Sequence, residues 1–83
     1  MEKEDILKKV NEIFIDVLED DNIVLTYETT ADDVEDWDSL NHIHLVVAVE
    51  KGFKVRFTSQ EIQSWKNVGE MIDSILENWI ELR

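Results

Sequence analysis

The sequence contains no cysteine and no proline, and it has only two glycines. Without cysteine the chain can form neither a disulfide framework nor a cysteine-ligated metal cluster, which are the usual supports of small secreted domains. Without proline, nothing forces a break within a helical pattern. We expect a single domain spanning residues 1–83 with one modest core, because a chain of this length buries only about 60 to 65 percent of its unfolded surface.

Basic side chains are also scarce. Eight Lys and Arg residues stand against twenty Asp and Glu residues, which gives a net charge of −12. A field of this sign repels phosphate backbones and anionic lipid surfaces, so we expect neither nucleic acid nor a membrane as a partner. The acidic surface by itself requires no explanation beyond solubility.

Long apolar runs are missing as well. No stretch approaches the roughly eighteen consecutive apolar residues of a membrane span. The first five residues, MEKED, contain no apolar signal region. We therefore expect a cytosolic or organelle-interior protein, with the cytoplasm as the predicted location. The protein is also expected to be a monomer.

Apolar residues recur at helical spacing near both ends of the chain. The pattern over Glu4–Glu19 predicts an amphipathic helix. A second such pattern over Val68–Ile80 predicts the last helix, and Asn67 with Glu70 has the spacing of a capping box at its start. This last pattern contains the apolar residues Val68, Met71, Ile72, Ile75, Leu76, Trp79 and Ile80.

Between Asp20 and Asp38 the apolar residues have no regular spacing, and the segment is predicted to be a long ordered loop. Thr30 is placed to cap one short turn within it. The side chains expected to anchor this loop are Ile23, Leu25, Tyr27, Val34 and Trp37.

A helix is predicted to begin at Asp38 or Ser39, either of which can cap it, and to run to about Lys51, with Gly52 as the stop. Its apolar residues cover more of the circumference than one core-facing stripe requires, so part of this surface must face something else. They are Leu40, Ile43, Leu45, Val46, Val47, Ala48 and Val49.

In the next segment, 53–57, apolar and basic residues alternate briefly, as in a strand. No partner strand is expected, so the segment is predicted to be an extended connector. Thr58 and Glu61 then form a capping-box pattern for a short helix. Three longer helices and one short one result. The predicted fold class is all-α, a four-helix bundle with a long loop between the first and second helices.

The segment Asp36–Leu40, in which Ser39 follows an aspartate and precedes a leucine at a helix start, resembles the signature of the acyl carrier protein family. The resemblance covers nearly the whole chain, because the run Val49–Phe53 and the apolar repeat after Val68 also lie where carrier proteins have them. It implies a stand-alone carrier with the same helical fold, and not an enzyme.

The resemblance implies that Ser39 bears a 4'-phosphopantetheine arm supplied from coenzyme A by a phosphopantetheinyl transferase, with Asp38 in support. A helix N-terminus suits the resulting phosphodiester, since it presents free amides and partial positive charge. The other implied partners are acyl- or aminoacyl-activating ligases, acyltransferases and synthases of fatty-acid, lipid or secondary-metabolite biosynthesis. The cargo is open among a fatty acyl chain, a short hydroxyacyl group and an amino acid.

By the same resemblance, the helix after Ser39 both lines an acyl pocket and docks partner enzymes. The implied pocket residues are Ile43, Val46, Val49, Ile62 and Trp65, with the first three facing inward. The implied partner contacts are Leu40, Asn41, His44, Val47 and Glu50.

The family pattern is incomplete at a few positions. Asp36 replaces the glycine usually found three residues before the serine, and Asn41 replaces an acid. His42 and His44 stand where fatty-acid-synthesis carriers often have acids or neutral residues. These departures indicate a specialised carrier.

Other functions are weaker fits to the sequence. Ser39 and His42 lie three residues apart, but the chain lacks a nucleophile elbow and room for a substrate cleft, which argues against a hydrolase. His42 and His44 point about 200 degrees apart on a helix and cannot chelate one metal ion, so both are interpreted as surface histidines. The serious alternative is an acidic helical adaptor that binds a basic partner and carries no cofactor.

Overall fold

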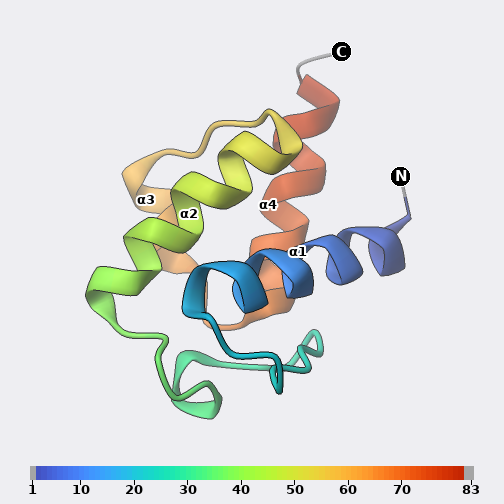
Figure 1. Cartoon of the computed structure of the whole chain (residues 1–83). Helices are drawn as coiled ribbons and strands as arrows, with labels where there is room; N and C mark the ends of the chain where they lie inside the picture. Colours follow the sequence, from blue (N-terminus) through green and yellow to red (C-terminus); the bar gives the residue numbers. More distant parts are fainter. Residues whose placement is uncertain (1, 82–83) are drawn as a thin grey trace.

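The computed structural model describes residues 2–81, with side-chain placements for residues 2–78. The elements are helix α1, a short 3-10 turn η1, and helices α2, α3 and α4 (Figure 1). They span Lys3–Leu18, Ala31–Asp33, Ser39–Phe53, Ser59–Ser64 and Val68–Glu81, in that order. No strand occurs in this part of the chain. The predicted all-α fold, with three longer helices and one short one, is confirmed.

Helix α1 buries every fourth residue, because that spacing returns to one face of an α-helix. Ile6, Val10 and Phe14 are almost completely buried against the other helices. The helix ends where Glu19 adopts the left-handed conformation, with φ 54°, and donates its amide to the Ile15 carbonyl.

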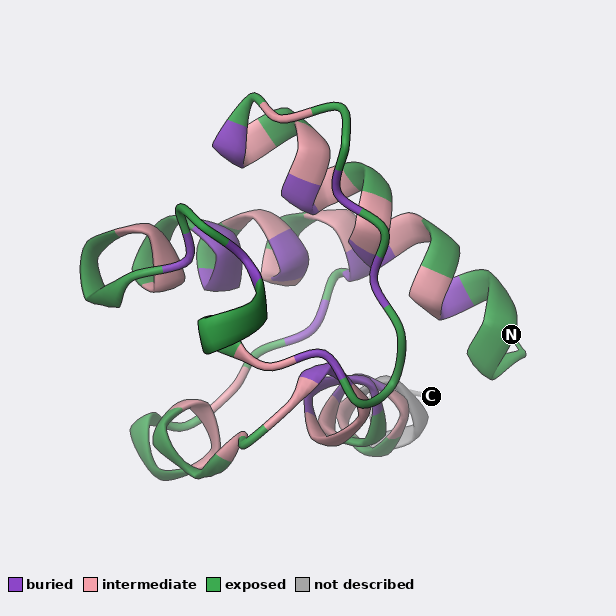
Figure 2. Cartoon of the chain, turned by 90° about the horizontal axis from the view of Figure 1, so that it is seen from below, coloured by how far each residue is buried: buried purple, intermediate pink, exposed green. Residues whose placement is uncertain are grey.

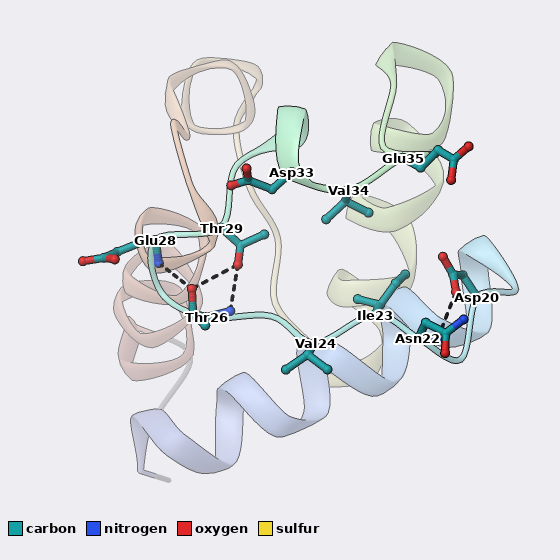
Figure 3. Close-up of a pocket in the computed structure, with 10 residues that line it drawn as sticks. All are labelled: Asp20, Asn22, Ile23, Val24, Thr26, Glu28, Thr29, Asp33, Val34 and Glu35. Carbon is teal, nitrogen blue, oxygen red and sulfur yellow. Dashed lines mark hydrogen bonds between the residues drawn. The ribbon is translucent and has the colours of Figure 1, made fainter.

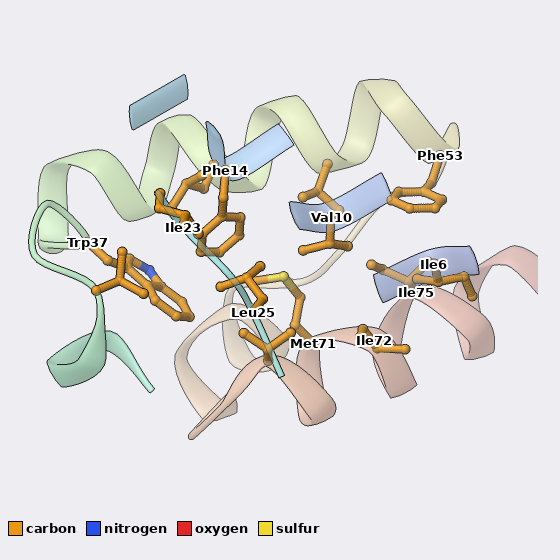
Figure 4. Packing of buried hydrophobic residues seen from close by; sticks show 14 of the residues in the cluster. Ile6, Val10, Phe14, Ile23, Leu25, Trp37, Phe53, Met71, Ile72 and Ile75 are labelled. Carbon is orange, nitrogen blue, oxygen red and sulfur yellow. The ribbon is translucent and has the colours of Figure 1, made fainter. Parts of the chain in front are cut away.

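The core lies where α1 packs against α2 and α4 (Figures 1 and 4). Figure 2 shows the buried positions turned toward this common centre and the exposed positions away from it. Side chains from the long loop complete the core, so the loop is part of the packed domain. The labelled core residues in Figure 4 are Ile6, Val10, Phe14, Ile23, Leu25, Trp37, Phe53, Met71, Ile72 and Ile75.

The loop is anchored to α1 by one side chain. The Asn11 amide donates to the Ile23 carbonyl at 3.2 Å, and the Asn11 carbonyl oxygen accepts from the Leu25 amide at 2.6 Å. Four of the five expected anchors, Ile23, Leu25, Val34 and Trp37, are buried. The fifth expectation is wrong, since the Tyr27 side chain is 38% exposed; this residue contributes its backbone carbonyl instead.

The predicted turn after Thr30 is confirmed as η1, where the Asp33 carboxylate accepts from the Thr30 amide at 3.0 Å. Close to it, the Thr29 hydroxyl accepts from the Thr26 amide at 2.8 Å (Figure 3). These short-range bonds satisfy backbone groups that a loop leaves without helix or sheet partners.

The predicted stop of α2 at Gly52 is wrong. The helix continues to Phe53 and ends where Lys54 adopts φ 57° and donates its amide to the Glu50 carbonyl. Phe53 is 7% exposed, and the Lys9 ammonium lies 5.0 Å from its ring centroid. Burial of Phe53 therefore extends the helix, and Lys54 bears the left-handed backbone that glycine usually takes. Residues 55–58 then form the expected connector without helix or strand, which begins two residues later than predicted.

The long loop also caps α4. Its carbonyls at Thr29 and Tyr27 accept from the amides of Val68 and Gly69, at 2.9 and 2.8 Å. These amides belong to the first turn, where no intrahelical acceptor exists. The side chains of Trp79 and Ile80, expected to continue the apolar stripe of α4, lie outside the described side chains. No helix within residues 2–81 is long and apolar enough to cross a membrane.

We predict that Gly69→Ala destabilises the fold. A Cβ atom at this position would lie 2.8 Å from the Tyr27 carbonyl oxygen, which is backbone and cannot move without losing its own contact with α4. The cost expected from such overpacking is about 1 to 3 kcal/mol of unfolding free energy, measured by urea denaturation.

Gly52→Ala is the matched control. The added Cβ would meet only the movable Ile13 methyl, at 3.1 Å, and the Lys9 side chain at 3.8 Å. Alanine also favours the helix by about 1 kcal/mol, so this variant is expected to stay within about 1 kcal/mol of wild type. A Gly69→Ala protein as stable as wild type would contradict the role assigned to the loop carbonyls.

Candidate functional site

Ser39 is the first residue of α2, and Asp38 is its N-cap. The Asp38 carboxylate accepts from the Asn41 amide at 2.9 Å, and the Asp38 carbonyl accepts from the His42 amide at 2.8 Å. Ser39 itself is exposed. The residue before the serine therefore caps the helix, and the serine hydroxyl stays free to be presented at the positive end of the helix dipole.

Two of the departures from the carrier signature, Asp36 and Asn41, have a structural explanation. The Asn41 side-chain amide donates to the Asp36 carbonyl at 2.8 Å and so fixes the loop directly before the serine. Asp36 does not need glycine's freedom, because the non-glycine residues with positive φ in the described chain are Glu19 and Lys54. Asn41, expected to be a partner contact, is half-buried and has this internal bond.

His42 joins the loop to α2. Its Nδ1 accepts from the Trp37 indole Nε1 at 3.0 Å, and the two rings stack with centroids 6.0 Å apart. An indole N–H can only donate, so Nδ1 must be the unprotonated ring nitrogen and Nε2 the protonated one. Nε2 lies 3.4 Å from the Ile62 carbonyl on α3.

The expectation of a surface histidine is therefore wrong for His42, which is half-buried, while His44 is exposed as expected. Both ring nitrogens of His42 face partners other than Ser39. His42, the imidazole three residues from Ser39, is therefore not placed to act as its base, which counts against the hydrolase hypothesis. No group of three or more potential metal ligands occurs among the described residues.

The short helix α3 is held in place at both ends. Thr58 and Glu61 form the predicted capping box, with bonds of 3.0 and 3.1 Å. The Glu61 carboxylate also accepts from the Asn78 amide of α4 at 3.0 Å. At the other end, the Trp65 indole donates to the Ser74 hydroxyl at 2.8 Å, again on α4.

An open cleft of about 620 Å³ lies between α2 and α3 beside Ser39. It joins the helix start to aromatic and apolar side chains from the loop and from α3. The residues that line it are Ala31, Trp37, Asp38, Ser39, His42, Ile43, Ile62, Gln63, Trp65 and Lys66.

A second depression, of about 690 Å³, lies on the long loop and is edged by carboxylates such as Asp20, Asp33 and Glu35 (Figure 3). It does not contain Ser39 or any other residue predicted for the site. We assign the candidate site to the cleft at Ser39, because a helix N-terminus, an exposed hydroxyl and apolar walls meet there.

The predicted pocket residues separate into two groups. Ile43, Ile62 and Trp65 line the cleft, whereas Val46 and Val49 are buried in the helix packing and do not. The expectation that Ile43 faces inward is wrong, because its side chain is 61% exposed. The inward stripe of α2 passes instead through His42, Leu45, Val49 and Phe53, with Val46 beside it.

Three apolar side chains of α2 form an exposed patch, which we call the α2 patch: Leu40, Ile43 and Val47, at 67%, 61% and 43% exposure. Two of these, Leu40 and Val47, were predicted partner contacts. Glu50, also predicted as a contact, is half-buried, and its carboxylate accepts from the Phe57 amide at 3.0 Å. Glu50 therefore has a structural role in fixing the connector.

Comparison with known proteins gives a consistent result. Residues 8–75 match the sequence family described as "Phosphopantetheine attachment site". An acyl carrier protein of Petrotoga mobilis is 31% identical over 77 residues, covering 93% of this chain and 91% of the relative. One from Acidothermus cellulolyticus is 35% identical over 75 residues, covering 90% and 89%.

A solved structure is similar over the same extent. The solution NMR structure of a holo acyl carrier protein from Geobacter metallireducens superposes with a TM-score of 0.85 at 41% identity. The match covers 92% of this chain and 87% of the other.

The hydrogen bonds of Glu61 in the α3 capping box are expected to make the stability of the fold depend on pH. The hydrogen bond from the Thr58 amide, followed by that from Asn78, holds the pKa of Glu61 below its ordinary value of 4.5. The ionised carboxylate therefore stabilises the folded state at pH values above 4.5, and this contribution is lost as the pH falls through the lowered pKa. Since Glu61 is partly exposed, screening keeps the contribution below about 1 kcal/mol.

We expect Glu61→Gln, which keeps an oxygen acceptor but removes the charge, to be less stable than wild type near neutral pH. The difference should shrink to nothing in acid. Urea unfolding of both proteins across this pH range measures it. Stability curves that run parallel down to strongly acidic pH would show that the charge of Glu61 does not contribute.

Proposed function

The chain belongs to the phosphopantetheine-dependent acyl carrier protein family and is an acyl carrier protein with a covalent 4'-phosphopantetheine; on this basis we propose that Ser39 is the attachment residue. The observation that carries the proposal is an exposed serine at the first position of a capped helix, beside an open cleft. The bound group supplies a terminal thiol on which acyl groups are carried as thioesters.

The residues around Ser39 fit a phosphodiester. Ser39 and Leu40 occupy the first two positions of α2, so their amides lack intrahelical acceptors. The Asn41 amide is already used by Asp38. Two free amides and the positive end of the helix dipole thus remain for the phosphate oxygens, in a protein whose overall charge would otherwise repel them.

Asp38 has a second role in this proposal. Its carboxylate caps α2 and sits next to the modified hydroxyl. As in the family pattern, it helps to present Ser39 and interacts with the metal ion or a basic group of the phosphopantetheinyl transferase. Capping and recognition are compatible, because a carboxylate has two oxygens and several acceptor positions.

The carrier works with a transferase that activates it and with acyl-handling enzymes. We infer that these enzymes dock on the α2 patch, together with the exposed His44. An apolar patch on a strongly acidic molecule suits partners that have an apolar contact surrounded by basic residues. Acyl- or aminoacyl-activating ligases, acyltransferases and synthases are the proposed classes of partner enzyme.

In this proposal the protein is a substrate of these enzymes and has no catalytic role of its own. Its single-domain organisation, its monomeric state and its cytoplasmic location stay predictions.

The alternative of an adaptor without a cofactor is not favoured. Such an adaptor would use the α2 patch and the acidic surface equally well. It would not account for the match of residues 8–75 to the phosphopantetheine attachment family.

Intact-mass spectrometry tests the attachment residue. Purified protein is incubated with coenzyme A, magnesium and a broad-specificity phosphopantetheinyl transferase. Wild type is expected to gain one phosphopantetheine unit, and Ser39→Ala is expected to gain none, because it lacks the hydroxyl that attacks the pyrophosphate of coenzyme A.

Ser59→Ala is the matched control, since Ser59 is also an exposed serine at the first position of a capped helix. It should be modified as fully as wild type. Modification of Ser39→Ala, or loss of modification in Ser59→Ala, would place the arm elsewhere. Unmodified wild type with several transferases would favour the adaptor.

A further inference from the structure

We propose that His42 and Trp65 form a wall that closes the cleft toward the core, so that this carrier shelters only short acyl groups and leaves long acyl chains outside. The proposal rests on the attachment of the arm at Ser39. It concerns which cargo the cleft can hold, which membership of the family does not determine.

The wall is part of a continuous series of aromatic contacts. Phe14 in the core meets Trp37 edge to face at 4.9 Å between ring centroids. His42 stacks on Trp37 at 6.0 Å and meets Trp65 at 6.1 Å. Trp65 in turn meets Phe57 edge to face at 4.9 Å. The series runs from α1 to the connector, and its members Trp37, His42 and Trp65 line the cleft.

Hydrogen bonds fix the wall in position. Nε1 of Trp65 donates to the Ser74 hydroxyl at 2.8 Å, and His42 accepts from the Trp37 indole at 3.0 Å. Neither ring can swing aside without giving up a hydrogen bond and at least one aromatic contact. An alkyl chain long enough to pass the wall would have to break these interactions to enter.

The space behind the wall is already filled. Val49, which the sequence suggested as a pocket residue, is 0% exposed and belongs to the core cluster with Phe14 and Trp37. Val46, the other such residue of α2, is 4% exposed and does not line the cleft. Trp37, on which His42 stacks, packs among the core side chains of α1, α4 and the loop (Figure 4). On the near side of the wall, Ile43 and Ile62 give the mouth of the cleft an apolar lining that suits a short acyl group.

Loading with acyl-coenzyme A tests the proposal. The transferase attaches acetyl-, butyryl-, octanoyl- or palmitoyl-phosphopantetheine in one step, and the mass gain verifies loading. Native hydrophobic-interaction chromatography then reports how much of the cargo is exposed. In wild type we expect acetyl and butyryl forms to elute with the holo protein, and octanoyl and palmitoyl forms to be retained severalfold longer.

Trp65→Ala should open the cleft, so that its octanoyl form elutes close to its butyryl form. Trp65→Phe keeps a ring and its aromatic contacts but loses the bond to Ser74, so its octanoyl form should be retained nearly as long as that of wild type. Trp65→Leu replaces the alanine variant if that protein does not fold. The indole N–H signal of Trp65 provides a second readout, since in wild type it should shift with butyryl loading and not shift further with octanoyl.

The outcomes distinguish the proposed wall of His42 and Trp65 from the proposed attachment at Ser39. Octanoyl and palmitoyl wild-type forms that elute with the holo protein would overturn the wall, whatever the variants do. Equal retention of octanoyl forms in wild type and in the folded alanine or leucine variant would do the same. A failure of wild type to gain mass with any acyl-coenzyme A would instead overturn the attachment at Ser39, and with it this proposal.

Discussion

The hydrogen bond from the Trp37 indole to His42 is the contact on which the site depends. Trp37 ends the long loop and packs against Phe14 of α1, while His42 lies in the first turn of α2 and faces the Ile62 carbonyl of α3. One pair of side chains therefore connects three elements to the core. Asp38 and Ser39 lie between the two partners in sequence, so the position of the serine follows from this contact.

The two sides of helix α2 have different roles. One side of α2 packs Leu45, Val49 and Phe53 into the core, and the other exposes the α2 patch. The polar groups nearest the serine are mostly used internally, by Asp38 as cap and Asn41 as loop anchor. This arrangement presents one unused hydroxyl at the helix start, as expected for a carrier protein that is modified at a serine.

Much of the fold could be predicted from the sequence because it follows from local rules. Helical spacing located α1 and α4, and the spacing of Thr58 and Glu61 located α3. The errors occurred where tertiary contacts decide. Burial of Phe53 carries α2 past Gly52, and Trp37 draws His42 inward so that Ile43 turns outward. No local pattern reveals that the loop carbonyls of Tyr27 and Thr29 would cap α4.

NMR of the imidazole nitrogens tests the central contact most directly. We predict that Nδ1 of His42 is the unprotonated nitrogen and a hydrogen-bond acceptor, that Nε2 carries the proton, and that the Trp37 indole proton is protected from exchange. An Nδ1-protonated ring with a rapidly exchanging Trp37 indole proton would contradict it, because Ser39 would then no longer be positioned by a bond between Trp37 and His42.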